Sequence, residues 1–531
     1  MPIRMTDDEN EPEENNEDKK DSGGGLGVLA ILAVIGGLIF KYPKVMIPIL
    51  ILGLGGFICI ASFDDSDSSD ETETEESSSE TKSSKRVSLG AKFDEKKYDA
   101  TPVYEPLASG YGNSIPESST LIDYAPTRQS QGSQGSCTGW AISYAARTIL
   151  QSKLTGENPD DIAFSPAYLF NQNTDSNCDG AYPSDMLEGL KKQGNLPLSE
   201  FPYNEESCRK KPNADQKQQA KDFRIEGYQR LTVDGSNYET DIDSVKQYLS
   251  QGSPVVISME VGGTFPDLTK ATWFPTNKDY KEVKKYKRDG EAGDWGGHAM
   301  TAIGYDDNKD GGAVQIMNSW GEDFGKKGIF WLRYEDFNTF VREAYSLYPL
   351  AAITKKGVKN LRFGLIENKS EEHIQLTKKD DFTYRTTEPI KKGTRFKVSV
   401  ENDSPVYVYI FGKESDGSSY VLFPYNEKHS PYCGTKGVRV FPRKQSLEAD
   451  NIGTRDSIAV VFARENLDYN QLNSQINRSS GKSYGEKIKK ALSSKLSEVG
   501  ELGEGGDYIE LTTKEKDLKK LDALVIEFDK I

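Results

Sequence analysis

The sequence predicts an α+β domain over residues 87–352 and a mainly β, sandwich-like domain over residues 353–531, preceded by two apolar helices. Three observations predict this class. Helical and strand-like patterns are mixed in the first domain, and alternating strand-like runs dominate the second. Two long apolar stretches stand near the N-terminus. A chain of 531 residues has room for several units, since one domain usually takes about 100–200 residues.

The N-terminal section predicts a membrane hairpin. Residues 24–40 and 45–63 are apolar throughout and are separated by Lys41 to Lys44. A spanning helix needs about 20 apolar residues, and each stretch is close to that length. We therefore expect a multi-pass membrane protein with two helices. Its expected segments are an acidic disordered tail (1–23), a transmembrane hairpin (24–63) and an acidic, Ser/Thr-rich linker (64–86).

The charge distribution and the cysteine content exclude two classes of protein. The net charge is −16, and residues 1–22 and 64–86 each hold nine Asp/Glu against three Lys/Arg. A nucleic-acid-binding protein needs a basic face, so no nucleic-acid partner is expected. Five cysteines in 531 residues also exclude a scaffold built on disulfides.

Local patterns place elements in both soluble domains. In the first, they predict helices at 137–152 and at Ser184–Gln193, the latter capped by Ser184 and ended by Gly194, and strands at 254–260 and 299–305. In the second, they predict strands at 395–402, 405–411, 457–463 and 522–528 and a helix within 482–498.

Cys137 has the surroundings of a reactive thiol. It follows a Gly/Ser-rich turn that starts at Gln131, and it precedes an apolar helical pattern that starts at Trp140. At the first turn of a helix the backbone dipole favours an anion and lowers the pKa of a thiol. A buried structural cysteine is the alternative, but the flanking glycines expose backbone rather than fill a core. The pattern predicts a nucleophile.

His298 and Asn318 supply the groups that such a thiol needs. His298 is the only histidine between residues 87 and 352, and it opens an apolar strand after two glycines. The amide oxygen of Asn318 can fix the tautomer of an imidazole without adding a full charge. Trp320 can shield that hydrogen bond from water. The order Cys–His–Asn therefore predicts nucleophilic catalysis.

These motifs resemble the papain-like (C1 family) cysteine peptidases, in their bacterial branch, from about Pro116 to Tyr348. The motifs that carry the resemblance are Gln131, Ser136-Cys137, Cys178–Pro183, Gly297-His298-Ala299 and Asn318–Gly321. The resemblance implies a fold with a helical half and a β-barrel-like half, and it implies no cofactor or metal. The implied roles are nucleophile for Cys137, acid/base for His298, orienter for Asn318, oxyanion-hole donor for Gln131, and substrate binding for Gly180, Ala181, Tyr182 and Trp320.

The sequence departs from the family pattern in three places. Thr138 and Gly139 stand before Trp140, where the family usually has Trp directly after the cysteine. Cys178 and Cys208 fall at half-cystine positions that usually belong to different bridges, so a Cys178–Cys208 disulfide is a hypothesis. Such a bond would place the peptidase domain outside the cytoplasm. Residues 64–115 are also shorter than the inhibitory propeptide typical of the family.

One acidic motif invites a metal-site interpretation. Residues Asp306 to Gly311 match the start of a calcium loop, but Met317 stands where the bidentate glutamate should be. The motif lies between two apolar runs, so we expect a hairpin turn.

The expected function is that of a membrane-anchored cysteine endopeptidase acting on protein or peptide substrates. An acyl-transferring enzyme on the same three residues is one alternative, which Asn318 disfavours. A non-catalytic peptide-binding module is another, which the intact set of three disfavours. The C-terminal domain resembles a β-rich domain of unknown function found beside bacterial peptidases. It shows no catalytic set, and we expect it to bind substrate or an envelope partner.

Overall fold

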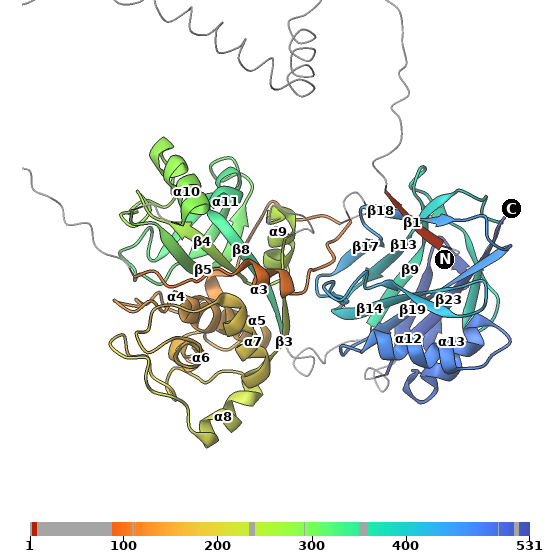
Figure 1. Cartoon of the computed structure of the whole chain (residues 1–531), viewed down its shortest axis with the longest axis horizontal. Coiled ribbons are helices and arrows are strands. Elements are labelled where there is room, and N and C mark those ends of the chain that lie inside the picture. Colours follow the sequence, from red (N-terminus) through yellow and green to blue (C-terminus); the bar gives the residue numbers. More distant parts are fainter. Residues whose placement is uncertain are drawn as a thin grey trace, which may run out of the picture. The chain divides into compact units, whose positions relative to one another are not determined.

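The computed structural model describes residues 3–7, 88–108, 111, 113–232, 239–290, 293–349, 359–497, 499–513 and 520–531 (Figure 1). The predicted hairpin (24–63) and linker (64–86) lie outside these residues. The predicted border at 352/353 also lies outside them.

The first half of the first domain is helical. One continuous helix holds α4 (Cys137–Gly139), the π-helical stretch η2 (Trp140–Arg147) and α5 (Thr148–Thr155), as the apolar pattern predicted. Around it lie α3 (Glu95–Ala100), η1 (Ile122–Tyr124), α6 (Pro166–Asn173), α7 (Pro183–Gln193), α8 (Ala214–Ala220) and η3 (Lys221–Phe223). The predicted cap of α7 is wrong. Tyr182 is the N-cap, because Pro183 takes the first helical position, where its missing N–H costs nothing.

The second half is a seven-stranded sheet in the order β3-β8-β4-β5-β6-β7, with β2 paired to β5. Its strands are β2 (Ser118–Thr120), β3 (Ile225–Arg230), β4 (Val255–Val261), β5 (Gly296–Asp306), β6 (Ala313–Met317), β7 (Ile329–Arg333) and β8 (Val341–Pro349). Its helices are α9 (Ile242–Ser250), α10 (Asn277–Asp289) and α11 (Tyr334–Phe340). Asp306 pairs with Ala313 where β5 turns into β6, so the acidic motif is the predicted hairpin turn.

The C-terminal domain consists of two eight-stranded sheets. One holds β1 (Ile3–Asp7), β9 (Lys359–Glu367), β10 (His373–Ile374), β13 (Arg395–Asn402), β17 (Gly437–Phe441), β18 (Gln445–Ala449), β20 (Val499–Leu502) and β22 (Ile509–Thr513). The other holds β11 (Leu376–Lys378), β12 (Thr383–Thr386), β14 (Val406–Lys413), β15 (Ser419–Phe423), β16 (Tyr432–Cys433), β19 (Arg455–Ala463), β21 (Gly505–Gly506) and β23 (Asp522–Asp529).

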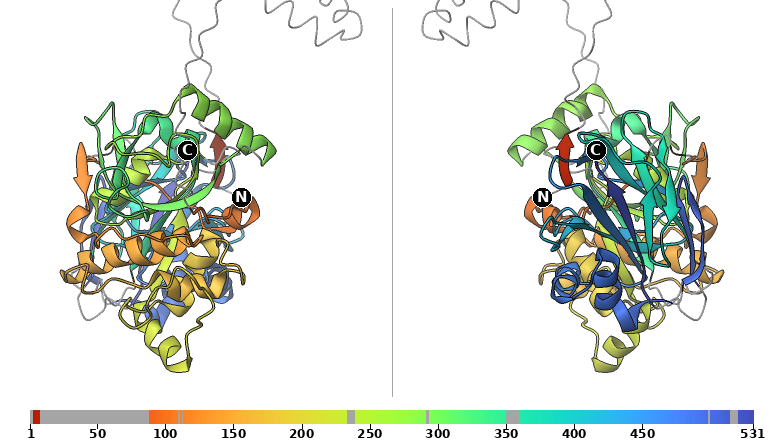
Figure 2. Two further views of the ribbon diagram at one scale, coloured as in Figure 1. Left: turned by 90° about the vertical axis from the view of Figure 1, so that its left-hand side faces the viewer. Right: turned by 90° about the vertical axis from the view of Figure 1, so that its right-hand side faces the viewer.

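The two sheets share one apolar core. Phe363 of β9 meets Phe462 of β19, with ring centroids 5.5 Å apart, and Phe396 of β13 meets Phe528 of β23 at 5.2 Å. Contacts between the inner faces of two sheets define a sandwich. The helices of this domain are α12 (Tyr469–Arg478), α13 (Tyr484–Leu492) and η4 (Ser493–Lys495). The right-hand view of Figure 2 shows α12 and α13 below the strands.

The N-terminal tail departs from the prediction of disorder at one place. Ile3–Asp7 forms β1 and pairs antiparallel with β18, so that Ile3 faces Ala449 and Met5 faces Leu447. The physical reason is the open edge of the sheet, which offers unpaired backbone groups to any short segment with strand-like alternation.

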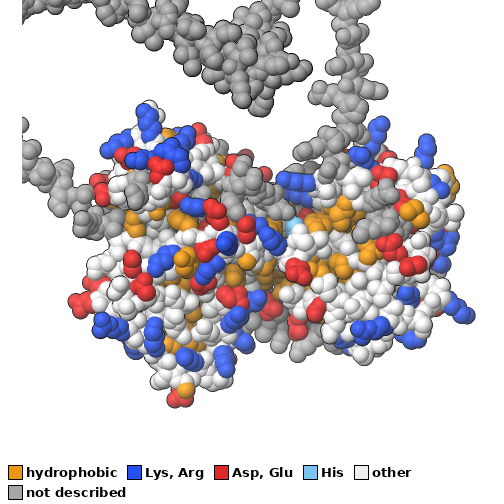
Figure 3. All heavy atoms as spheres, viewed as in Figure 1, with side chains coloured by type: hydrophobic (Ala, Val, Ile, Leu, Met, Phe, Trp, Pro, Cys, Tyr) orange, Lys and Arg blue, Asp and Glu red, His pale blue; other side chains and the backbone are white. Residues whose placement is uncertain are grey.

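The predicted localisation as a multi-pass membrane protein is contradicted. In the ranges that the structure describes, no helix is long and apolar enough to cross a bilayer, for which about 20 apolar residues are needed. The long helix α10, for example, has the charged sequence NKDYKEVKKYKRD, and basic side chains gather over it in Figure 3. We withdraw that localisation and, with it, the assignment of a side of the membrane to the peptidase domain.

Candidate active site

The three predicted catalytic side chains come from the two halves of the peptidase domain and are buried together. Cys137 is the first residue of α4, His298 lies in β5, and Asn318 directly follows β6. The backbone N–H of Ala299 donates to the Cys137 Sγ at 3.4 Å. Because Ala299 follows His298 in the chain, this contact places the thiol beside the backbone of the strand that carries His298.

The hydrogen bonds of Asn318 define the tautomer of His298. The Asn318 Oδ1 accepts from the backbone N–H of Ser319 at 2.7 Å, which identifies it as the amide oxygen. His298 Nε2 lies 2.7 Å from the same oxygen and therefore carries the proton. His298 Nδ1 has no hydrogen-bond partner among the residues described. Its lone pair is thus available to accept a proton.

Gln131 connects the loop before the nucleophile to the strand end that carries the asparagine. Its backbone N–H donates to the Ser319 carbonyl at 2.8 Å, and its Oε1 accepts from the Ser319 hydroxyl at 2.7 Å. Its side-chain Nε2 donates to the carbonyls of Ser88 at 3.1 Å and Gln134 at 2.8 Å. The predicted oxyanion donor is therefore held firmly, and one of its hydrogen bonds goes to a segment upstream of the helical half.

That upstream segment, residues 88–92, lies between the turn before Cys137, the start of β5 and Ala181, and we call this region the cleft. The backbone N–H groups of Gly90 and Ala91 both donate to the Gly297 carbonyl, at 3.1 and 3.0 Å. A Cβ at Gly90 would lie 1.9 Å from the Gly135 carbonyl oxygen, so only glycine fits this approach. The segment therefore lies against both the turn before Cys137 and the start of the strand that carries His298.

Ala181, predicted to bind substrate, already binds this segment through its backbone. Its N–H donates to the Gly90 carbonyl at 2.9 Å, and its carbonyl accepts from the Lys92 N–H at 3.1 Å. Cys178, three residues earlier, is joined to Cys208 by a disulfide. The bond anchors this wall of the cleft to the loop after α7.

The other residues predicted to bind substrate, Gly180, Tyr182 and Trp320, make separate contacts. The Gly180 carbonyl accepts from the Thr174 hydroxyl at 2.9 Å. The Tyr182 ring lies under the Lys97 ammonium, 4.3 Å from its centroid. The Trp320 ring lies 4.4 Å from the His298 ring, tilted by 30°, and covers one face of the imidazole.

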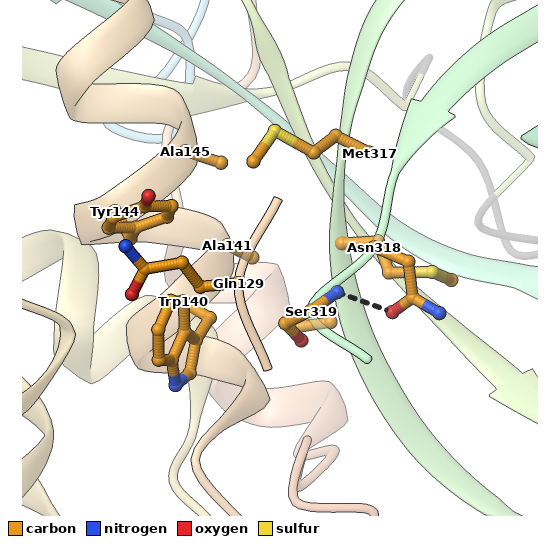
Figure 4. A pocket seen from close by; sticks show the side chains of 10 residues that line it. Gln129, Trp140, Ala141, Tyr144, Ala145, Met317, Asn318 and Ser319 are labelled. Carbon is orange, nitrogen blue, oxygen red and sulfur yellow. Dashed lines mark hydrogen bonds between the residues drawn. The ribbon is translucent and has the colours of Figure 1, made fainter. Parts of the chain in front are cut away.

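Behind these residues the two halves meet along an apolar seam with room for about one water molecule. Figure 4 shows Trp140 and Tyr144 of the helix on one side and Met317, Asn318 and Ser319 on the other. The seam is too small for a substrate. It fixes the separation of the two halves, and so the geometry of the triad.

Burial controls the protonation of the site. It raises the pKa of Cys137 to about 11, although N–H groups, including those of Ala299 and Gly90, lower it. It lowers the pKa of His298 to about 4, against the raising effect of the hydrogen bond to Asn318. Both directions disfavour a thiolate–imidazolium pair while residues 88–92 lie over the site, because desolvation opposes the effect of the helix dipole on Cys137.

Sequence reasoning missed two contributors to the site. Ser319 carries the link between Gln131 and Asn318, and its place inside the motif Asn-Ser-Trp-Gly was the only signal. Residues 88–92 carry no periodic pattern. Gly90 could have indicated a close backbone approach, because a residue without a side chain permits it.

Comparisons with known proteins assign families to two parts of the chain. Residues 123–350 match the family described as "Papain family cysteine protease", and residues 390–465 match a "Domain of unknown function (DUF4384)". The chain is 26% identical over 239 residues to cysteine proteinase 3 of Entamoeba histolytica, which covers 44% of this chain and 68% of that protein. It is 25% identical over 210 residues to cathepsin K of Mus musculus, which covers 39% of this chain and 55% of that protein.

Among solved structures, the chain is similar to xylellain, a cysteine protease from Xylella fastidiosa, with 20% identity and a TM-score of 0.40. That likeness covers 50% of this chain and 96% of xylellain. On the match of residues 123–350, the chain carries a papain-family cysteine protease domain, a peptidase of the hydrolase class, followed by a β-rich domain of unknown function.

Proposed function

We propose that this protein is a cysteine endopeptidase that hydrolyses peptide bonds of protein or peptide substrates through Cys137, His298 and Asn318. The observation that carries the proposal is the 2.7 Å contact between His298 Nε2 and Asn318 Oδ1, which leaves Nδ1 of the same ring without a partner among the described residues. The next residue in the chain, Ala299, contacts the sulfur of Cys137. The proposed peptidase domain spans residues 87–352, and the β-rich domain spans 353–531.

The proposed reaction has two halves. His298 Nδ1 takes the proton of the Cys137 thiol, and Sγ attacks the carbonyl carbon of the scissile bond. The Gln131 side-chain N–H and the Cys137 backbone N–H stabilise the oxyanion. The imidazolium then gives its proton to the leaving amine as the C–N bond breaks, which leaves a thioester. Water attacks the thioester, its proton returns through His298 to the sulfur, and the acid product leaves.

The contacts of residues 88–92 support the proposed mode of substrate binding. An extended chain finds backbone partners at Ala181 and Gly297 without any specific side chain. We assign the acyl side of the substrate to Gly180, Ala181 and Tyr182, and the wall beside His298 to Trp320. Because residues 88–92 take these same partners, a substrate can bind only after they leave.

The experiment is covalent labelling of Cys137 by an epoxysuccinyl inhibitor. We would use full-length Gly90→Val, because a side chain at residue 90 clashes with Gly135 and displaces the covering segment. Mass spectrometry should find one adduct, on Cys137, and the label should be lost in Cys137→Ala and strongly slowed in His298→Ala. A folded Gly90→Val protein that binds peptides but takes no label would be a binding module, and transfer of the acyl group to an added amine in preference to water would identify a transferase. Either result would contradict the proposal.

A further inference from the structure

The segment that fills the cleft is one end of a longer strap, residues 88–108, whose other end lies against the β-rich domain (Figure 1). At the cleft end, backbone hydrogen bonds to Gly297 and Ala181 hold it. Such bonds each contribute little net stability, because water offers the same groups alternative partners. A short peptide held by them alone would exchange rapidly with a substrate.

The middle of the strap is α3, which packs on β8 and on α7. The Tyr98 ring meets the Tyr345 ring edge to face, with centroids 5.3 Å apart, and Tyr98 is buried. Glu95 pairs with Arg342 at 3.1 Å, and Lys97 pairs with Asp185. The ion pairs are exposed and add little stability, so Tyr98 is the main contact of this part.

The far end of the strap lies between the two domains: Tyr104 is buried in the core of the first domain and its hydroxyl donates to Asp241 at 2.7 Å, while Val103 and Ala108 bind backbone groups of the β-rich domain. The Val103 N–H donates to the Lys428 carbonyl at 2.7 Å, and the Val103 carbonyl accepts from the Ser430 N–H at 2.8 Å. The Ala108 N–H donates to the Val438 carbonyl at 2.9 Å, at the start of β17. Val103 therefore joins the two domains, since it is bridged to His429 of the β-rich domain and to Arg230 of the first domain.

Arg439 fixes the centre of this contact. Its Nε donates to the Glu105 carbonyl of the strap at 3.0 Å. Its Nη1 donates to the Asn402 side chain at 2.7 Å and to the Thr435 carbonyl at 3.0 Å, and its Nη2 donates to the Thr435 hydroxyl at 2.6 Å, so the guanidinium is also held within the β-rich domain. Arg439 is 1% exposed. A buried, fully oriented donor of this kind makes a strong and specific hydrogen bond.

Asn113, five residues beyond the strap, closes the contact. Its Nδ2 donates to the carbonyls of Ala108 at 2.7 Å and Val438 at 2.9 Å, and its Oδ1 accepts from the Val438 N–H at 2.9 Å. The Ala108 side chain lies in a small apolar cluster with Ile366 and Val440. One amide and one methyl group thus connect the strap to two strands, β9 and β17.

The β-rich domain has a second, separate contact with the peptidase domain. The Tyr348 ring of β8 stacks on the Tyr432 ring of β16, with centroids 3.7 Å apart. This stack does not involve the strap. The strap can therefore loosen while the two domains stay together.

We propose that the β-rich domain is a clamp that keeps the strap in the cleft, so that the peptidase is off while residues 103–108 are held and turns on when they are released. The claim that the clamp controls peptidase activity rests on the proposed function, whereas the claim that it holds the strap does not. The clamp works through effective concentration. Anchoring residues 103–108 turns the binding of residues 88–92 into an intramolecular event, which a free substrate must outcompete.

The test compares full-length variants at the two ends of the strap. At the clamp, Asn113→Ala removes three hydrogen bonds, and Ala108→Asp places a charge in the apolar cluster. At the cleft, Gly90→Val displaces the strap directly. Lys96→Ala, at an exposed position of α3, is the matched control on the strap itself. The readouts are hydrogen exchange of the Gly90–Lys92 amides and the rate at which iodoacetamide alkylates Cys137.

Both clamp variants should speed exchange at residues 90–92 and alkylation of Cys137 by about tenfold, the effect of losing roughly 1.4 kcal/mol of anchoring. Lys96→Ala should match the wild type. Slow exchange in the β19 and β23 amides would show that the clamp variants remain folded, and Asn113→Ala, a half-buried position, is the milder of the two.

Wild-type exchange and labelling in both clamp variants, with fast rates in Gly90→Val, would overturn the clamp and leave the proposed function intact. Fast exchange at residues 90–92 in the clamp variants without any epoxysuccinyl label on Cys137 would support the clamp and contradict the proposed function. The two proposals can therefore fail separately.

Discussion

Two buried thiols, Cys137 in the cleft and Cys433 in the β-rich domain, differ in what covers them. Burial raises the pKa of each to about 11, and neither takes part in a disulfide. Cys433 lies in β16, within the apolar core shared by the two sheets. Cys137 is covered by residues 88–92, which are held by backbone hydrogen bonds. The cover of Cys433 is part of the sandwich, whereas the cover of Cys137 can leave without opening a sheet. The two thiols are equally buried, but their different covers predict that Cys137 reacts faster than Cys433.

The largest expected effect separates the two thiols by function. In the Gly90→Val background, where the cleft is uncovered, Cys137→Ala should lower the hydrolysis of a fluorogenic peptide by at least about 10³-fold, because no other group can form the thioester. Cys433→Ala should leave it within about twofold, since that side chain only fills the core. Equal losses in the two variants would mean that the sandwich contributes to catalysis and that the comparison is wrong.

A second prediction concerns the pH dependence of the equilibrium by which residues 88–92 leave Cys137. In the covered state, burial lowers the pKa of His298 from its ordinary value of 6.5 to about 4. Departure of the strap admits water and returns the pKa toward the ordinary value. Protonation stabilises the state with the higher pKa, so acid favours the open state from about pH 6.5 down to about pH 4. Each pH unit in that window is worth up to about 1.4 kcal/mol, or about tenfold.

Hydrogen exchange measures this effect independently of activity. The protection factors of the Gly90–Lys92 amides, which are corrected for the intrinsic pH dependence of exchange, should fall by up to about 15-fold between pH 6.5 and about pH 5. The protection of β14 and β19 should stay constant. His298→Ala should remove the dependence. A fall that persists in His298→Ala would assign it to another group.

The same contrast shows what the sequence could and could not predict. Cys137, His298 and Asn318 could be found because each sits in a local pattern: a Gly/Ser turn before a helix, two glycines before a strand, and a motif after a strand. The strands β13, β14, β19 and β23 could be found from alternation within a few residues. Long-range contacts leave no such pattern, so neither the strap in the cleft nor the pairing of β1 with β18 was predicted.

A third prediction separates two buried asparagines in the same way. Asn318→Ala, in the Gly90→Val background, should lower peptide hydrolysis by about tenfold, because a buried His298 Nε2–H left without its acceptor costs roughly 1–3 kcal/mol. Asn402→Ala should leave hydrolysis unchanged in that background and lower the free energy of unfolding instead, since its amide bonds to Cys433 and Thr435 lie inside the sandwich. If Asn402→Ala alone slowed hydrolysis, the two regions would not be independent.

The smallest expected effect on hydrolysis comes from the disulfide beside the cleft. Cys178 and Cys208 are separated by 30 residues in the chain, so the double variant Cys178→Ser/Cys208→Ser should lower the free energy of unfolding by roughly 3 kcal/mol. Hydrolysis in the Gly90→Val background should change by no more than about threefold, mostly in KM. The reason is that the wall at Gly180 has its own support, the hydrogen bond from Thr174, and that the triad is positioned by Ser319 and Gln131 on the far side of the cleft. Denaturant unfolding and steady-state kinetics measure the two quantities. A loss in kcat of more than about tenfold without a loss of stability would show that the wall at Ala181 helps to position the reacting carbonyl, and that this side of the cleft takes part in catalysis as well as in binding.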